Sequence, residues 1–298
     1  MTGAEQGFLL LTSHLGDPAR PVLTVSQFRT LADRMLRRQP ASEERDLQLQ
    51  DLLSLGYGRE MADRILRLLR DESLLHHYIS RGKRLDCVPV TRVTDGYPLI
   101  LRQRLGQDSP GTLWGKGDLS LLNHPAISLV GSRELKQQNR LFAEKVGKAA
   151  AEQGFVLLSG NAKGADQAAQ EACLAAGGEV VSVVADRLDV QPEREDILYL
   201  SEDGFDLPFS PQRALSRNRV IHGMGRMTFV AQCTLEKGGT WDGAVSNLKR
   251  NYSPVFCYDD GSPAAVELTQ RGATLIKAGM LDDLRKLLDT TVGLQIEL

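Results

Sequence analysis

The sequence predicts an α/β protein with a Rossmann-like, doubly wound, mostly parallel sheet and a small all-helical domain at the N-terminus. From residue 126 onward, short continuous apolar runs alternate with helical stretches, a pattern typical of parallel strands buried on both faces. A chain of 298 residues is long enough for one large and one small domain. The strand-like runs are 126–130, 155–158, 180–184, 227–231 and 254–257.

Three segments are expected along the chain. Residues 1–85 predict a helical domain, because leucine, isoleucine and methionine recur there at helical spacing. Within it, residues 52–58 have the outline of a helix-hairpin-helix or SAM-like module, although a simple turn between two helices explains the same residues. Residues 86–125 are expected to connect this domain to the core and pack on it, and residues 126–298 to form the Rossmann-like domain.

Composition excludes several classes of protein. The formal net charge is −2, so any site for a polyanion must be a local patch. The chain has neither an apolar run of about 18 residues nor a basic leader, so we expect a cytoplasmic protein without a membrane span. His76 and His77 are expected at the surface. Widely spaced cysteines predict reduced thiols and no metal site: Cys87, Cys173, Cys233 and Cys257.

Three polar loops follow predicted strands, at the edge where parallel sheets bind ligands. Gly131-Ser132-Arg133 combines a glycine, a hydroxyl and a guanidinium, a set suited to phosphate, although a plain tight turn is the alternative. The helix after this turn would offer free N–H groups. In the second loop, Asp166 either caps N–H groups or orients a ligand hydroxyl. The candidate residues of the second and third loops are Ser159, Gly160, Lys163, Gly164, Asp166, Lys237, Gly238, Gly239 and Thr240.

A basic cluster, Arg217-Asn218-Arg219, precedes the 227–231 strand. Charge clusters usually lie on solvated faces, but this one is placed to lean over the same sheet edge. Because the carboxyl ends of parallel strands meet at one edge, the loops and the cluster together predict an anion-binding site. The G-x-G-x-x-G fingerprint is absent, so no dinucleotide cofactor is expected.

In this order, the loops resemble the DNA-processing protein A family (DprA, also called Smf), part of the SLOG superfamily of Rossmann-like domains. The resemblance covers roughly residues 95 to 280. The matching segments are ISLVGSR at 127–133, LLSGNAKGAD at 157–166, SRNRVIHGMG at 216–225, KGGTWDGA at 237–244 and RGATLI at 271–276.

The resemblance implies single-stranded DNA binding at a basic pocket on this sheet edge, without enzymatic activity or a cofactor. It also implies a homodimer that hands the strand to a RecA-like recombinase during natural transformation or recombination. No room is expected for a winged-helix tail. Carried over by position, the pocket residues are Gly131, Ser132, Arg133, Ser159, Gly160, Gly164, Asp166, Arg217, Asn218 and Arg219.

The chain departs from the family pattern at several positions. Ala165 replaces an isoleucine, Gln170 a histidine and Gln232 an acidic residue, and Gly238-Gly239 replaces a serine-glycine pair. The stretch 185–196 lacks the usual glycine, tyrosine-proline pair and asparagine. It instead carries acids that make this rim less basic: Asp186, Asp189, Glu193, Glu195 and Asp196.

Two other functions remain open. Some SLOG members cleave nucleoside monophosphates or sense nucleotide-derived signals, and in such an enzyme Asp242 or Glu236 would act on the ribose. The departures also suit a scaffold protein that has kept the fold and lost the site. Aromatic residues make up only 5% of the chain, which disfavours stacking on many rings and leaves Trp241, beside the third loop, as the ring of interest.

Overall fold

The computed structural model describes residues 1–37, 46–202 and 204–289. Its strands form one sheet in the order β1-β2-β6-β5-β4-β3-β7-β8-β9. All neighbours from β6 to β9 pair in parallel, whereas β1 and β2 pair antiparallel at one edge. The predicted Rossmann-like, mostly parallel sheet is confirmed.

Chain order reverses in the middle of the sheet. From β3, the chain builds β4, β5 and β6 toward one side, and then β7, β8 and β9 toward the other. The point of reversal lies between β3 and β7, which is where an open α/β sheet leaves a crevice. The strands are β1 (Cys87–Thr91), β2 (Thr112–Lys116), β3 (Ala126–Val130), β4 (Val156–Ser159), β5 (Val180–Val183), β6 (Ile197–Glu202), β7 (Thr228–Val230), β8 (Val255–Tyr258) and β9 (Thr274–Ile276).

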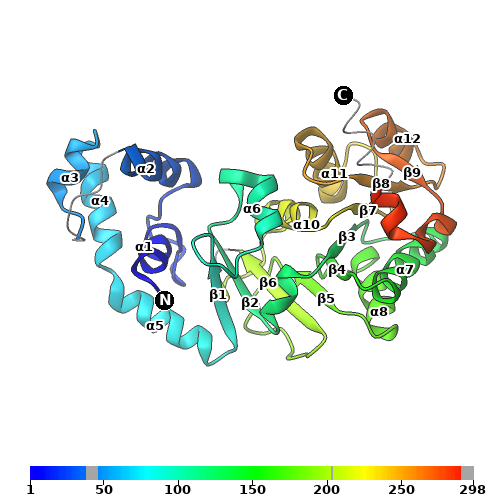
Figure 1. Cartoon of the computed structure of the whole chain (residues 1–298), viewed down its shortest axis with the longest axis horizontal. Coiled ribbons are helices and arrows are strands. Elements are labelled where there is room, and N and C mark those ends of the chain that lie inside the picture. Colours follow the sequence, from blue (N-terminus) through cyan, green and yellow to red (C-terminus); the bar gives the residue numbers. More distant parts are fainter. Residues whose placement is uncertain (38–45, 203, 290–298) are drawn as a thin grey trace.

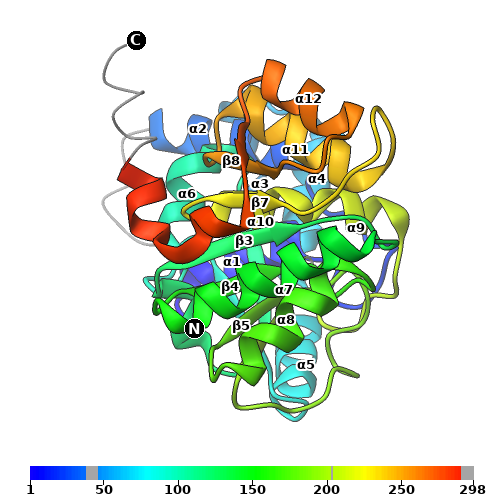
Figure 2. The same ribbon diagram turned by 90° about the vertical axis from the view of Figure 1, so that its right-hand side faces the viewer.

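Helices cover both faces of the sheet (Figures 1 and 2). Ile127 and Leu129 of β3 pack in the core beneath α7 (Gln137–Glu152) and α8 (Ala165–Ala175). Val130, with the opposite orientation, packs in the second core. Because both sides of each central strand are buried, the strands appear as unbroken apolar runs. The second face carries α6 (Leu99–Leu105), α10 (Asn218–Met224), α11 (Gly238–Arg250) and α12 (Pro263–Gln270).

Five helices gather at one end of the molecule (Figure 1). Residues 55–58 form the turn between two of them, and Gly56 adopts a φ of +81°, which favours glycine. The guanidinium of Arg34 lies 4.5 Å from the centre of the Tyr57 ring in this turn. The division of the chain into domains stays a prediction. The helices are α1 (Gly3–Thr12), α2 (Val25–Arg37), α3 (Leu49–Ser54), α4 (Arg59–Arg70) and α5 (Glu72–Lys83).

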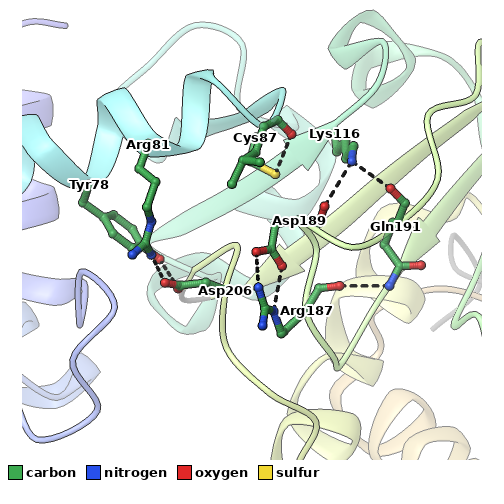
Figure 3. A network of polar contacts seen from close by, with 9 residues as sticks. Tyr78, Arg81, Cys87, Lys116, Arg187, Asp189, Gln191 and Asp206 are labelled. Atoms are coloured by element: carbon green, nitrogen blue, oxygen red, sulfur yellow. Dashed lines mark hydrogen bonds and ion pairs between the residues drawn. The ribbon is translucent and has the colours of Figure 1, made fainter.

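Aromatic and polar contacts attach α5 to the sheet. The Tyr78 ring stacks on Phe205 with 4.5 Å between ring centres and meets Trp114 edge-on at 5.2 Å. The Tyr78 hydroxyl donates to Asp206 Oδ1 at 2.7 Å, and Arg81 pairs with the same carboxylate (Figure 3). These contacts link the N-terminal helices to the segment between β6 and α9 (Pro211–Ser216).

The remaining sequence predictions concern cysteines, metals and membranes. All four cysteines are buried and free. Within the described ranges, no group of three or more His, Cys, Asp or Glu side chains is placed to hold a metal ion. Among the same residues, no helix combines the length and apolarity needed to span a bilayer. His76 and His77 lie exposed on α5.

Candidate functional site

A cavity of about 590 Å³ opens at the carboxyl ends of β3 and β7, where the chain order reverses. We call it the switch-point cavity. The first and third loops, the start of α8 and the basic cluster all contribute to its wall. The predicted residues that line it are Gly131, Ser132, Arg133, Asp166, Arg217, Asn218, Lys237, Gly238, Gly239 and Thr240.

The first loop is hydrogen-bonded to Gln232, a residue just after β7. Both the N–H and the hydroxyl of Ser132 donate to the carbonyl oxygen of Gln232, at 2.9 and 3.2 Å. The Ser132 hydroxyl therefore stabilises the conformation of the loop. The exposed Arg133 side chain supplies the positive charge of this part of the cavity wall. A Cβ at Gly131 would lie 2.4 Å from the Cβ of Ala165, so the contact between loop and α8 requires glycine here.

The helix that follows the first loop differs from the expectation. α7 begins only at Gln137, and the N–H of Lys136 just before it donates to Gln232 Oε1 at 3.0 Å. The amide nitrogen of Gln232 in turn donates to the carbonyl oxygen of Glu134 at 3.0 Å. The departure at position 232 thus has a structural role, because its side chain shapes the stretch between loop and helix.

Asp166 acts as a cap in the second loop. Its Oδ2 accepts the N–H groups of Gly160 at 3.1 Å and Ala162 at 3.3 Å. Burial raises the pKa of Asp166, and the charge of Arg217 and the two N–H donors oppose that rise. Gly164 adopts a φ of +89°, and a Cβ there would lie 2.4 Å from the carbonyl oxygen of Arg133. The loop is therefore braced against its neighbour.

Besides Gly164, three predicted residues of the second loop lie outside the lining of the switch-point cavity. Ser159 is fully buried, and its hydroxyl accepts a hydrogen bond from Gln170. Gly160 leaves room for the guanidinium of Arg217, as described below. Lys163 is exposed and lies outside the set of residues that line the switch-point cavity.

Arg217 and Arg219 take different directions from the same segment. Arg217 lines the cavity, and its Nη2 donates to the carbonyl oxygen of Gly160 at 2.8 Å. Its Nε is buried and has no acceptor among the described residues, so this guanidinium retains an unused donor. Arg219 instead pairs with Glu202 at 2.9 Å and does not line the cavity.

The third loop directs the start of a helix at the cavity. α11 begins at Gly238, and its first turn lines the wall together with Lys237. The first N–H groups of a helix lack intrahelical partners and carry partial positive charge, which favours anions. The Thr240 side chain has a structural role, since its hydroxyl donates to the carbonyl oxygen of Gly131 at 3.0 Å. Asn218 donates to the carbonyl oxygen of Gly239 at 3.1 Å.

An apolar wall faces these basic groups, and sequence reasoning missed it. Phe209 and Leu215 line the cavity while remaining 53% and 50% exposed. The sequence contained a signal for Phe209. It lies in the stretch Pro208-Phe209-Ser210-Pro211, which belongs to no amphipathic helix or strand that would account for an aromatic residue there. Trp241, by contrast, is only 5% exposed and packs against Arg271.

The negative charge of the acidic stretch 185–196 is partly neutralised by arginines of the same stretch. Asp189 pairs with Arg187 (Figure 3), and Asp196 pairs with Arg194 at 2.7 Å. The bound arginine lowers the pKa of each carboxyl group, so both remain ionised and compensated. The rim therefore opposes an anionic ligand less than its composition implies.

Comparison with known proteins gives consistent matches. Residues 89–287 match the family model described as DNA recombination-mediator protein A. DNA processing protein DprA of Streptococcus pneumoniae is 33% identical over 205 residues, which cover 62% of this chain and 69% of that protein. DprA of Bacillus subtilis is 26% identical over 211 residues, covering 66% and 69%.

Solved structures share the fold. The X-ray structure of DNA processing protein A from Streptococcus pneumoniae superposes with a TM-score of 0.70 at 26% identity and covers 94% of this chain and 97% of its own. A structure of the Helicobacter pylori protein, described for its single-stranded DNA binding mode, superposes with a TM-score of 0.55 at 22% identity, covering 70% and 96%. At that identity the second likeness concerns the fold alone.

Proposed function

Because the chain belongs to the DNA recombination-mediator protein A family, we propose that it binds single-stranded DNA through phosphates at the switch-point cavity. The observation that carries the proposal is the convergence of three cations from separate segments on one cavity, the partly buried Arg217 and the exposed Arg133 and Lys237. Guanidinium and ammonium groups form strong, charge-assisted hydrogen bonds with phosphate oxygens.

Phosphate recognition would be shared among several groups. Arg133 and Lys237 are exposed cations that line the cavity, and the first turn of α11 adds N–H groups to the same wall. Such contacts are independent of base sequence and weaken strongly with salt. The proposed contact residues are Gly131, Arg133, Arg217, Asn218, Lys237, Gly238, Gly239 and Thr240.

The apolar wall would receive bases. Phe209 presents an exposed ring beside the cationic groups, and one aromatic face can stack on any of the four bases. A phosphate site beside a stacking ring suits a nucleic-acid strand whose bases are unpaired. A duplex would keep its base faces covered.

Fluorescence anisotropy of a labelled oligothymidylate across a salt series tests the proposal. Replacing Arg133 and Lys237 together by alanine should weaken binding at low salt by about tenfold or more. The slope of log K against log salt should become shallower by about 1.4, because each lost single-strand phosphate contact contributes about 0.7. A matched control replaces Arg285 and Lys286, two adjacent exposed cations that do not line the cavity. Wild-type protein that binds no strand at low salt would overturn the proposal.

A nucleotide hydrolase has weaker support, and we propose a non-catalytic role. Glu236 and Asp242 are exposed and lie outside the lining of the switch-point cavity. Asp166 does line it, but two backbone N–H groups occupy its Oδ2. Incubation with nucleoside monophosphates should release no free base. Release that disappears in an Asp166→Asn variant would contradict the non-catalytic role.

Assembly and handover form the last part of the proposal. The protein would act as a homodimer and pass the strand to a RecA-like recombinase during transformation or recombination. Light scattering of the purified chain tests the dimer. RecA filament assembly on coated oligothymidylate, with and without the chain, tests the handover, and no acceleration would contradict it.

A further inference from the structure

A second cavity, of about 740 Å³, lies between the N-terminal helices and the segment that carries β1, α6 and β2. None of the roles proposed above uses it. Its wall combines aromatic rings with guanidinium groups, and we call it the arginine-rimmed cavity. The lining residues that matter here are Phe8, Phe28, Arg29, Arg92, Arg102 and Arg219.

The apolar part of this cavity is built around two rings. Phe8 and Phe28 meet edge to face, with 4.8 Å between ring centres and 72° between ring planes. Phe8 is buried and packs tightly on the chain before β2, where a Cβ at Gly111 would lie 2.6 Å from its ring. Phe28 is only half-buried, so it is the ring available to a ligand.

The rim has more arginines than acids, although Arg20 is paired with Asp71 at 3.0 Å, Arg219 with Glu202, and Arg29 with Asp108. Of the described residues that line the cavity, Asp33 is the one acid, against five arginines. Burial lowers the pKa of Arg92, and the nearby charges of Arg102 and Arg29 lower it further, as expected where cations crowd together. Asp108 offsets part of this charge through its ion pair with Arg29 at 3.1 Å. The remaining positive charge favours an anionic ligand.

A short chain of side-chain contacts links the walls of the two cavities. Arg217 lines the switch-point cavity and also, with Glu202, a small hollow next to it. Glu202 pairs with Arg219, which lines the arginine-rimmed cavity. The cavities therefore flank Glu202 along one edge of the sheet, since β6 ends at Glu202 and β2 begins beside it.

We propose that the arginine-rimmed cavity holds a further segment of the strand that occupies the switch-point cavity. A base would lie against Phe28, and phosphates would contact Arg102 and Arg92. A nucleotide carries an aromatic face and an anion a short distance apart, which matches a half-buried ring beneath a rim of guanidinium groups. This inference rests on the proposed function, because it assigns a longer track to the same ligand.

Oligonucleotides of two lengths distinguish binding at the switch-point cavity from binding at both cavities. An oligothymidylate of about six nucleotides should occupy the switch-point cavity alone, and one of about 24 should reach both. Arg102→Glu reverses an exposed charge, and we expect it to weaken the longer strand about tenfold while leaving the shorter one unchanged. Phe28→Leu keeps an apolar side chain and removes the ring, so it provides a second variant. Arg285→Glu is the matched control.

Photocross-linking gives an independent readout. A 5-iodouracil base placed at successive positions of the longer strand should cross-link to the peptide that contains Phe28 at some positions and to the peptide that contains Phe209 at others. Cross-links confined to the Phe209 peptide would overturn the inference.

The outcomes distinguish this inference from the proposed function. If wild-type protein binds neither strand, the proposed function itself is wrong. If both strands bind and Arg102→Glu weakens neither, or weakens both equally, only the extended track is wrong. Thermal unfolding of each variant shows whether the fold is intact, and the cross-linking of the wild-type chain decides the matter if a variant does not fold.

Discussion

At the scale of single residues, the shape of the switch-point cavity depends on glycines, which leave room for neighbouring groups. A Cβ built at Gly160 would lie 1.9 Å from Nη1 of Arg217. The glycine therefore makes room for the arginine, which then donates to the Gly160 carbonyl oxygen. The sequence analysis placed Gly160 in the pocket itself, whereas in the structure this glycine acts by making room for Arg217.

Gly160→Ala should impair binding more than folding. The new methyl group would displace the far end of Arg217, a flexible side chain, and no positive φ forbids alanine at this position. We expect affinity for single-stranded DNA to fall about tenfold, the usual scale for one charge-assisted contact. Anisotropy titration measures this.

Gly7→Ala provides the matched control, since a Cβ there meets nothing within 4 Å. Alanine in the middle of α1 should stabilise the chain by about 0.5–1 kcal/mol and leave binding unchanged. Unaltered affinity in a folded Gly160→Ala variant would show that Arg217 does not hold the strand.

At the scale of elements, a buried polar network fixes α10 and α11 relative to β7. Asn247 of α11 lies 3.0 Å, from Nδ2 to Nδ1, from His222 of α10. The side-chain Oδ1 of Asn247 accepts the N–H of Ser253, whose hydroxyl lies 2.8 Å from that of Thr228 in β7. Because α11 directs its first turn at the cavity and Arg217 precedes α10, this network positions two walls of the site.

The same network predicts a pH dependence of stability. Burial lowers the pKa of His222 from 6.5 to about 4, so the unfolded chain takes up this proton first as the pH falls. The free energy of unfolding should therefore decrease between about pH 6.5 and pH 4, by roughly 3 kcal/mol in total. Above pH 6.5 this residue adds no pH dependence.

His222→Gln isolates that contribution, because an amide oxygen can accept from Asn247 and does not titrate. Urea unfolding at pH 7 and at pH 4.5 should show a smaller loss of stability in the variant than in the wild type. Parallel losses in both proteins would mean that other groups dominate the acid response.

At the scale of the whole molecule, one aromatic cluster joins the N-terminal helices to the sheet. Phe205 is fully buried between Tyr78 of α5 and Trp114 of β2, with ring centres 4.5 and 5.0 Å away. The Asp206 carboxylate next to it binds Tyr78 and Arg81 (Figure 3). The arginine-rimmed cavity depends on this junction, because its lining comes both from the N-terminal helices and from the segment around β2 that the junction holds together.

Phe205→Ala should loosen the junction at a cost of about 3–5 kcal/mol, the usual range for deleting a buried ring. Trp114 is fully buried in the wild type and would become hydrated, so tryptophan emission should shift to longer wavelength. Trp241, the other tryptophan, packs in the opposite core and should contribute no change. An unshifted spectrum together with unchanged stability would contradict this account.

Sequence by itself determined the architecture of the core and the position of its loops. A central parallel strand is buried on both faces, so its apolar run is a local signal, and β3, β4 and β5 lie within a residue of the predicted runs. Loops that follow such strands must meet at one edge, which is why Arg133 and Lys237 line one cavity.

Only the tertiary structure decided where the side chains of that edge point. The Ser132 hydroxyl binds a carbonyl group 100 residues away, and the Phe209 ring joins a wall that no periodic pattern marks. Arg219 pairs with Glu202 across 17 residues and thereby lines a different cavity from Arg217. These directions follow from contacts between distant parts of the chain. The local sequence predicts which elements are buried. It does not predict which distant residue each side chain contacts.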